Sequence, residues 1–369
     1  MSRKLLFSSI AALTAGGAFA DAPSVAVDIA PVHSLVARVM DGVAEPALVI
    51  PAGASPHEYT LRPSEAAALE NADVVFWMGE DLTPWLEDAV ETLADDASVL
   101  ALLEADGTVL LEFREDALFE EHDHSDHADH DDHGHEEHAD HDDHDHEEHA
   151  EAKHSDHDDH DHEEHADAGH DDHDHEEHAE AGHDDHDDHG HEDHAGHDHG
   201  EHDPHAWLSP ENAANWLNVI AAELSAVDPE NAGAYFANAA AAKTEMEVLK
   251  AEVAATLEPV RGKRFIVFHD AYQYFETSFD FPASGAISLG DAADPSPARI
   301  AEIQSRVREE GIDCVLAEPQ YNPGLVATVM DGTDTATGVL DPLGSALEPG
   351  PALYPTILRN LAGTLADCL

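Results

Sequence analysis

The chain has 369 residues, of which 81 are Asp or Glu and only 15 are Lys or Arg, giving a formal net charge of −66. Such a charge excludes electrostatic attraction to nucleic acid or to an anionic membrane surface. The 32 His are unevenly placed, since 28 of them lie in residues 121–202 together with 36 acidic residues and one Lys. The chain therefore combines ordinary protein sequence with one acidic, imidazole-rich segment.

The first twenty residues have the pattern of a secretory signal peptide. Arg3 and Lys4 precede an apolar stretch, and a small-x-small cleavage site ends at Ala20. An uncleaved membrane anchor is the alternative, but the stretch is shorter than the roughly 20 residues that a membrane span needs. We therefore predict an exported, soluble protein whose mature chain begins near Asp21.

Apolar runs alternate with helical patterns after the predicted signal peptide. They predict strands at residues 25–29, 47–50 and 73–78, and helices at residues 32–40 and 64–71. Ser64 is the expected N-cap of the second helix. Alternation of strand and helix predicts an N-terminal α/β lobe with a parallel sheet over residues 21–120.

Residues 121–202 are a low-complexity insert without Val, Ile, Leu, Met or aromatic side chains, so they have nothing with which to build a core. Three identical decamers (HDDHDHEEHA) begin at His141, His157 and His170, at unequal spacings that exclude a solenoid of fixed period. We expect no persistent fold without metal, and loose binding of several zinc ions by imidazole and carboxylate groups. An inert solvated segment is the alternative.

The sequence after the insert predicts a connection between two lobes. Residues 203–229 complete the N-terminal lobe with one helix, and a long helix follows at residues 230–259, after a break near Asp228 and Pro229. A helix of roughly 28 residues would span about 42 Å, longer than one small domain is wide. Such a helix suits a connector.

Residues 260–369 repeat the α/β alternation and form the predicted C-terminal lobe. Its strands are expected at residues 264–268, 283–289, 314–317 and 337–340, and its helices at 271–279, 297–310, 323–330 and 355–367. Ser296 is the expected cap of the helix that begins at Pro297. Cys314 and Cys368 are an even pair in an exported chain, which favours a disulfide over two free thiols or a thiolate metal site.

Four His lie outside the insert. His33 falls inside the first predicted helix and is assigned a structural role. His57 and His269 follow or end predicted strands, and His205 precedes a helix. Loops at the carboxyl ends of strands converge in open α/β sheets, and three neutral imidazoles meeting there would suit Zn²⁺. The sequence therefore predicts a metal site of His57, His205 and His269.

Five motifs outside the insert resemble those of the zinc-binding periplasmic component of the high-affinity zinc ABC importer, the ZnuA type of metal-binding solute-binding proteins. The resemblance covers essentially the whole chain outside the insert, and the second and third motifs together are specific. The motifs are SPHEYTLRPS at residues 55–64, DPHAWLSP at 203–210, FHDAYQYF at 268–275, AEPQ at 317–320 and LDPLG at 340–344.

The resemblance implies two α/β lobes, each with a mostly parallel sheet flanked by helices, joined by one long rigid linker helix, with Zn²⁺ in the inter-lobe cleft. It implies that His57, His205 and His269 bind zinc as transported cargo and that the protein is not an enzyme. The implied partners are an inner-membrane ABC permease and other periplasmic zinc chaperones, with the chain itself a monomer in the periplasm. The acidic, His-rich insert and the pair Cys314 and Cys368 match the same type.

The fourth metal ligand remains open. Some relatives carry a Glu immediately before the first ligand His, where this chain has Pro56, which offers no ligand. Water, Asp341, Glu58 or a His of the insert could fill the position. A three-His site without a carboxylate should favour zinc over manganese, which prefers oxygen donors.

Three further residues and two other functions are also open. Asp270, Glu318 and Tyr272 are candidates for fixing an imidazole tautomer, or have ordinary strand-end and helix-cap roles. Three His with an open position would also suit a zinc hydrolase, although no His-Glu-x-x-His motif is present in the sequence. A periplasmic zinc buffer without a transporter is the second alternative function.

Overall fold

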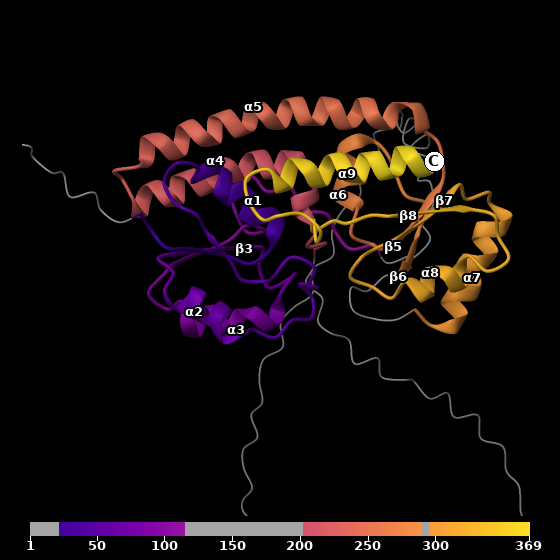
Figure 1. The fold of residues 1–369 in the computed structure, drawn as a ribbon, viewed down its shortest axis with the longest axis horizontal. Coiled ribbons are helices and arrows are strands. Elements are labelled where there is room, and N and C mark those ends of the chain that lie inside the picture. The colour runs from indigo at the N-terminus through magenta and orange to yellow at the C-terminus, as the bar shows by residue number, and fades with distance from the viewer. Residues whose placement is uncertain (1–21, 115–201, 289–294) are drawn as a thin grey trace, which may run out of the picture. The chain divides into compact units, whose positions relative to one another are not determined.

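A computed structural model of the chain describes residues 22–114, 202–288 and 295–369, all of which belong to one compact unit (Figure 1). The predicted signal peptide, the predicted insert apart from His202, and Leu289 at the end of one predicted strand lie outside these residues. Within the described ranges, every helix is too short or too polar to cross a membrane.

The N-terminal lobe contains a four-stranded parallel sheet in the order β2-β1-β3-β4. Its strands are β1 (Val25–Val27), β2 (Ala47–Leu48), β3 (Val74–Trp77) and β4 (Ser98–Ala101). All residues of β1 and β3 are buried, as expected for central strands of a sheet that is covered on both faces. The prediction of a parallel α/β lobe is confirmed.

The helices of this lobe are α1 (Ala30–Val39), α2 (Pro63–Glu70) and α3 (Pro84–Leu93). The prediction of Ser64 as an N-cap is wrong, because α2 begins one residue earlier at Pro63 and Arg62 occupies the cap position. The first position of a helix favours proline, which explains the start at Pro63. The Glu65 carboxylate also accepts a hydrogen bond from the Arg62 N–H at 2.7 Å, as in a capping box. Helix α3 and strand β4 were not predicted.

The C-terminal lobe contains a second four-stranded parallel sheet, in the order β6-β5-β7-β8. Its strands are β5 (Phe265–His269), β6 (Ala286–Ser288), β7 (Cys314–Ala317) and β8 (Ala336–Val339). Successive side chains of a strand point to opposite faces. Accordingly Phe265 and Val267 join the larger core, while Ile266 and Phe268 join a second core with side chains of α7 and α8.

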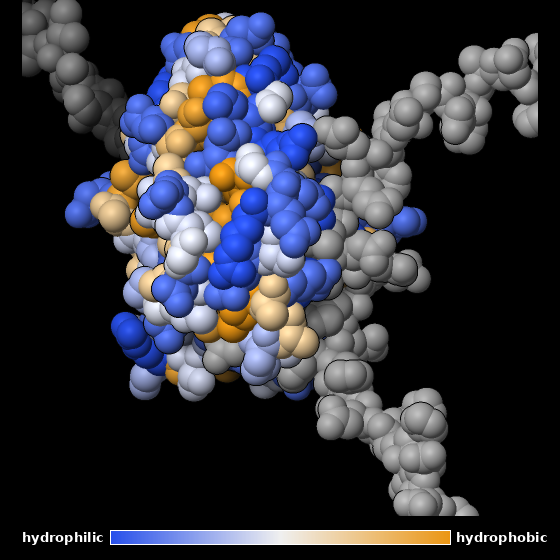
Figure 2. Space-filling model, turned by 90° about the vertical axis from the view of Figure 1, so that its right-hand side faces the viewer, coloured by the Kyte–Doolittle hydropathy of each residue, from blue (hydrophilic) through white to orange (hydrophobic). Residues whose placement is uncertain are grey.

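The helices of the C-terminal lobe are α6 (Gln273–Phe279), α7 (Pro297–Glu309), α8 (Pro323–Val329) and α9 (Leu353–Cys368). The expected cap of α7 is confirmed, since the Ser296 side chain accepts a hydrogen bond from the Arg299 N–H. In Figure 2 the exposed face at this end of the molecule carries many hydrophilic residues around small apolar areas, which is typical of solvent-facing surface.

The N-terminal lobe ends with the 3-10 turn η2 (Ala206–Leu208) and helix α4 (Pro210–Val227), and α5 (Ala232–Leu257) then leads to the C-terminal lobe through the 3-10 turn η3 (Glu258–Val260). The 26 residues of α5 correspond to about 39 Å. The helix packs on α1 and α4 along one part and on α9 along another (Figure 1). Its buried residues recur every three or four positions along one face: Tyr235, Ala239, Ala242, Met246, Leu249, Val253 and Leu257. The predicted long connecting helix is confirmed.

Helix α9 adds a second connection between the lobes, because it packs on α1 and α5 as well as on β8. The Tyr354 N–H donates to the Ser34 hydroxyl at 2.9 Å, and the Tyr354 hydroxyl donates to the Trp207 carbonyl at 2.8 Å. One continuous apolar core contains residues of both sheets and of α4, α5 and α9. The parts of the two lobes that carry the candidate site are therefore held by shared packing.

The structure contains the expected disulfide between Cys314 in β7 and Cys368 at the end of α9, with Cα atoms 5.9 Å apart. It closes a loop of 54 residues. The bond thus fixes the last turn of α9 to the C-terminal sheet.

Replacing both cysteines by serine should lower the free energy of unfolding by up to about 4 kcal/mol, because the reduced chain regains the loop entropy that the disulfide removes. Urea unfolding followed by circular dichroism measures this change. The wild-type chain unfolded in reductant is the control and should match the variant. Equal unfolding midpoints for the oxidised wild type and the variant would contradict the expectation.

Candidate metal centre

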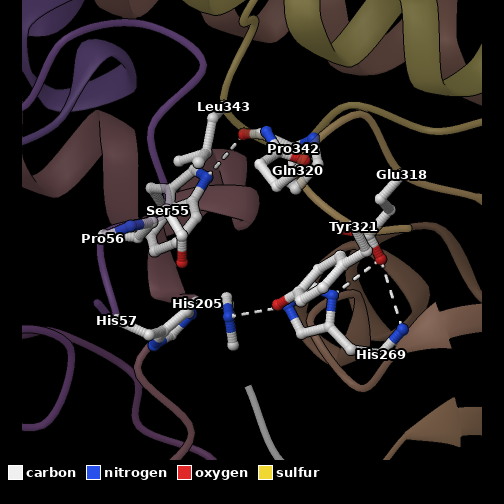
Figure 3. A pocket seen from close by; sticks show the side chains of 11 residues that line it. Ser55, Pro56, His57, His205, His269, Glu318, Gln320, Tyr321, Pro342 and Leu343 are labelled. Atoms are coloured by element: carbon white, nitrogen blue, oxygen red, sulfur yellow. Dashed lines mark hydrogen bonds and ion pairs between the residues drawn. The ribbon is translucent and has the colours of Figure 1, made fainter. Parts of the chain in front are cut away.

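The structure brings together the three His that the sequence singled out, although they come from distant parts of the chain. One nitrogen from each of His57, His205 and His269 lies within 4.8 Å of the others. The ring centroids are 5.4 Å apart for His57 and His205, 6.2 Å for His57 and His269, and 5.2 Å for His205 and His269. Figure 3 shows the three rings turned toward one space.

Each ring is placed by a different kind of element. His57 lies in the loop after β2, His205 is the N-cap of η2, and His269 is the last residue of β5. Among these, His205 and His269 are almost fully buried, whereas His57 is half-buried. The site is therefore open to solvent on the side of His57.

The loop that carries His57 is held by two aromatic side chains. The Trp85 indole N–H donates to the Pro56 carbonyl at 2.7 Å, and Tyr59 donates from its hydroxyl to Glu65 at 2.8 Å. The Tyr59 and Trp85 rings also pack edge-on. These contacts fix the backbone on both sides of the first imidazole.

Two buried carboxylates orient the other two imidazoles. Asp203 Oδ1 lies 2.7 Å from Nδ1 of His205, and Glu318 Oε1 lies 2.7 Å from Nδ1 of His269. Each carboxylate accepts a hydrogen bond from a proton on the facing Nδ1, which leaves Nε2 of each ring as its acceptor nitrogen. The two Nε2 atoms are 3.4 Å apart, and both point into the same space. A single metal ion bound by both imidazoles needs this arrangement of the two nitrogens.

Of the three residues predicted as possible partners of an imidazole, only Glu318 contacts one by a hydrogen bond at a ring nitrogen in the described structure. Asp270 instead forms an ion pair with Arg114. Tyr272 lies beside His269 with ring centroids 6.4 Å apart, and burial raises the pKa of its phenol well above the usual value. Asp203 was not predicted, although an Asp two residues before His205 in a Pro-containing turn is a sequence signal for this contact.

Aromatic rings complete the walls of the site. The Trp207 ring centroid is 5.2 Å from that of His205, and its indole N–H donates to the Pro342 carbonyl at 3.0 Å. Tyr321 stacks on Phe268 and lies 5.2 Å from the His269 ring. The space within these walls has a volume of about 10 Å³, enough for one small ion or water molecule.

Neither protein carboxylate considered as a fourth ligand joins the three imidazoles. The Asp341 carboxylate accepts hydrogen bonds from the backbone N–H groups of Gly344 at 2.9 Å and Ser345 at 2.7 Å, so it closes its own turn. Glu58 is exposed. Among the described residues, the group that could hold a metal consists of the three His alone.

Acidic side chains surround the imidazoles. Asp203, Asp270, Glu276 and Glu318 are all buried, and the Arg114 guanidinium pairs with two of them. Burial raises the pKa of Asp270 to about 6, and the nearby Arg114 opposes this shift. A cluster with more buried acids than bases attracts a divalent cation.

His33 lies apart from this centre. It is buried in α1, and its Nε2 lies 3.0 Å from the Pro46 carbonyl oxygen. The structural role expected for it fits these contacts.

Fold and site together define a two-lobed α/β protein in which three imidazoles from both lobes form a group that could hold a metal ion. The chain belongs to the family described as ZnuA, zinc-uptake complex component A, periplasmic, whose profile matches residues 25–368.

Individual relatives agree with this family. The high-affinity zinc uptake system protein ZnuA of Brucella abortus (strain 2308) is 42% identical over 345 residues, which are 94% of this chain and 91% of that protein. The protein of the same name from Paracoccus denitrificans (strain Pd 1222) is 43% identical over 351 residues, 95% of this chain and 93% of that protein. A crystal structure of ZnuA has the same fold, with a TM-score of 0.65 at 19% identity, covering 94% of this chain and 99% of that chain.

Substitutions of Glu318 test whether the carboxylate prepares His269 for metal binding. Glu318→Gln keeps an oxygen that can accept from Nδ1 but removes the charge, whereas Glu318→Ala removes both. We expect zinc affinity to fall about 10-fold for Gln and about 100-fold for Ala, as measured by competition with a chromophoric chelator. Glu309→Gln, an exposed change on α7, is the matched control. Unchanged affinity in Glu318→Ala would rule out this role.

Proposed function

We propose that this chain captures Zn²⁺ in the periplasm through His57, His205 and His269 and delivers it to an ABC-type zinc importer. The observation that carries the proposal is the pair of Nε2 atoms of His205 and His269, 3.4 Å apart and each aimed by a carboxylate on the opposite ring nitrogen. Two imidazoles with this orientation and a third within reach supply the nitrogen donors that zinc favours. The names of the relatives support zinc uptake as the process.

The geometry supports binding and transport better than hydrolysis. The small volume between the rings suits an ion and leaves little space for an organic substrate beside it. The absence of a carboxylate from the three-His group also favours zinc over manganese, since manganese prefers oxygen donors. The fourth position is assigned to water or to a His of the insert, because Asp341 is engaged in its own turn and Glu58 is exposed.

We assign the rest of the chain to the same task. A signal peptide at residues 1–20 exports a monomeric protein, an N-terminal lobe (21–120 and 203–229) and a C-terminal lobe (260–369) bind zinc between them, and residues 230–259 connect the lobes. The insert at residues 121–202 collects zinc weakly, because each of its sites must order a chain that has no core residues. An inner-membrane permease receives the ion, with periplasmic zinc chaperones as further partners.

The central test uses His57→Ala, His205→Ala and His269→Ala in a chain that lacks residues 122–200, which keeps His202 in place. We expect the parent of this series to bind one zinc ion tightly in calorimetry, because the cleft site does not need the insert. Each His→Ala variant should lose tight binding, because it removes one of three donors. His33→Ala is the matched control and should keep the site, since His33 contacts Pro46 instead.

Two results would contradict the proposal. Loss of tight binding in the parent that lacks the insert would move the principal site into the insert. Tight binding in all three His→Ala variants would remove these residues from the site.

Acidification should release zinc from the insert before it releases zinc from the cleft. Imidazole with its ordinary pKa near 6.5 becomes protonated between pH 7 and pH 5 and then cannot bind metal. The weaker sites lose this competition first. Zinc stoichiometry of the full chain, measured after dialysis at pH 7 and at pH 5, should fall from several ions to about one, whereas simultaneous loss of all the zinc would contradict the two classes of site.

A further inference from the structure

A segment before the insert pairs with the last residue of the insert in a short strap next to the candidate metal centre; the strap is defined here as residues 109–114 and 202–203. Glu112 and His202 form an antiparallel β-bridge, and the Asp203 N–H donates to the Leu111 carbonyl at 2.8 Å. Asp203 is also the partner of His205. The strap therefore contains Asp203, the residue that orients the proposed zinc ligand His205.

One end of the strap is attached to the N-terminal lobe. The Asn212 side chain, in α4, accepts from the Val109 N–H at 2.8 Å and donates to the Val109 carbonyl at 3.0 Å. Asn212 is completely buried. A buried amide that satisfies both backbone groups of one residue fixes this position firmly.

The other end is attached to the C-terminal lobe. The Tyr274 hydroxyl, in α6, accepts from the Leu111 N–H at 2.9 Å and donates to the Asp203 carbonyl at 2.9 Å. A single phenol thus holds both chains of the strap. The strap spans from α4 to α6 and so ties together the lobes that carry His205 and His269.

Arg114 makes the strongest of these attachments. Its guanidinium donates to both oxygens of Asp270, with Nε 2.8 Å from Oδ2, and its Nη1 donates to Glu276 Oε2 at 2.8 Å. The Arg114 side chain is 20% exposed, and those of Asp270 and Glu276 are 7% and 5% exposed. Charge-assisted bonds shielded from solvent in this way are strong and weakly screened by salt.

The position of this ion pair links it to the zinc ligand. Asp270 directly follows His269, and Glu276 also accepts from the Ala283 N–H at 3.1 Å in the segment leading to β6. Arg114 therefore grips the turn between β5 and α6 at the residue next to the imidazole. A zinc ion held by all three imidazoles must lose the His269 ligand before it leaves, so a contact that holds this turn in place also holds that ligand at the ion.

We propose that Arg114 is a positioning residue that slows the dissociation of zinc by holding the strap against the turn that carries His269. This inference rests on the proposed role of the three His in zinc binding. The ion enters and leaves by the same route, past the half-buried His57. The strap acts on the bound state, because it keeps His269 in place against the ion, so its loss should mainly raise the dissociation rate constant.

The test compares zinc release from the full-length wild type and Arg114→Gln, each loaded with one equivalent of Zn²⁺ and mixed with excess chromophoric chelator in a stopped-flow instrument. We expect the dissociation rate constant to rise about 10- to 100-fold in Arg114→Gln, with a much smaller change in the association rate constant. Arg114→Lys, which keeps a positive charge but not the planar fork, should lie between the two.

The matched control is Arg38→Gln. Arg38 is also 20% exposed and pairs with a carboxylate, Glu245, but it joins α1 to α5 away from the imidazoles. Its variant should release zinc at the wild-type rate. Circular dichroism checks that each variant is folded.

If Arg114→Gln does not fold, Glu276→Gln tests the same link, because it removes one partner of Arg114 and leaves Asp270 in place. This variant should also release zinc faster than wild type. If the folded Arg114 and Glu276 variants release zinc at the wild-type rate, or if Arg38→Gln releases it equally fast, the proposed role of Arg114 is overturned while the proposed function stands. A wild-type chain that releases all its zinc rapidly would overturn the proposed function and the strap with it.

Discussion

Two buried carboxylates decide which nitrogen of each neighbouring imidazole faces the cleft, and the chemistry of the site depends on that choice. Asp203 and Glu318 each hold a proton on Nδ1, so the Nε2 lone pairs of His205 and His269 point at each other across 3.4 Å. Two acceptor nitrogens that face each other in this way are stabilised by a cation between them. Imidazoles without these partners would be free to turn, and each metal ion would have to order them first.

The fold matters because it delivers the three rings from places that are far apart in the chain. His57 depends on a loop fixed by Trp85, His205 on the turn before α4, and His269 on the last position of a buried strand. Helices α5 and α9 both pack against elements of the two lobes, and one apolar core continues between them. Shared packing of this kind resists large rearrangement, so small changes in side-chain contacts near the cleft control how firmly the rings are held.

The sequence predicted the parts of this structure that have a strong local signal. Strands such as β3 are continuous apolar runs, and the three lone His stood out because all other His but one lie in the insert. Strand β4 was missed because it is half-exposed and has no clear pattern. Arg114 could not be found from sequence, since its partner Asp270 is 156 residues away and the contact exists only after folding. Asp270 was one of three candidates for fixing an imidazole tautomer, but in the structure its carboxylate pairs with the Arg114 guanidinium.

The bridge between Glu112 and His202 has a consequence for how the sequence of this chain can change in evolution. Because Glu112 and His202 are paired, the chain leaves and re-enters the described structure at one place. The entropic cost of closing a loop rises only with the logarithm of its length, by about 0.6 kcal/mol for each doubling. Gain or loss of whole decamers would change the number of imidazoles in the chain, while the paired residues Glu112 and His202 lie outside the repeats.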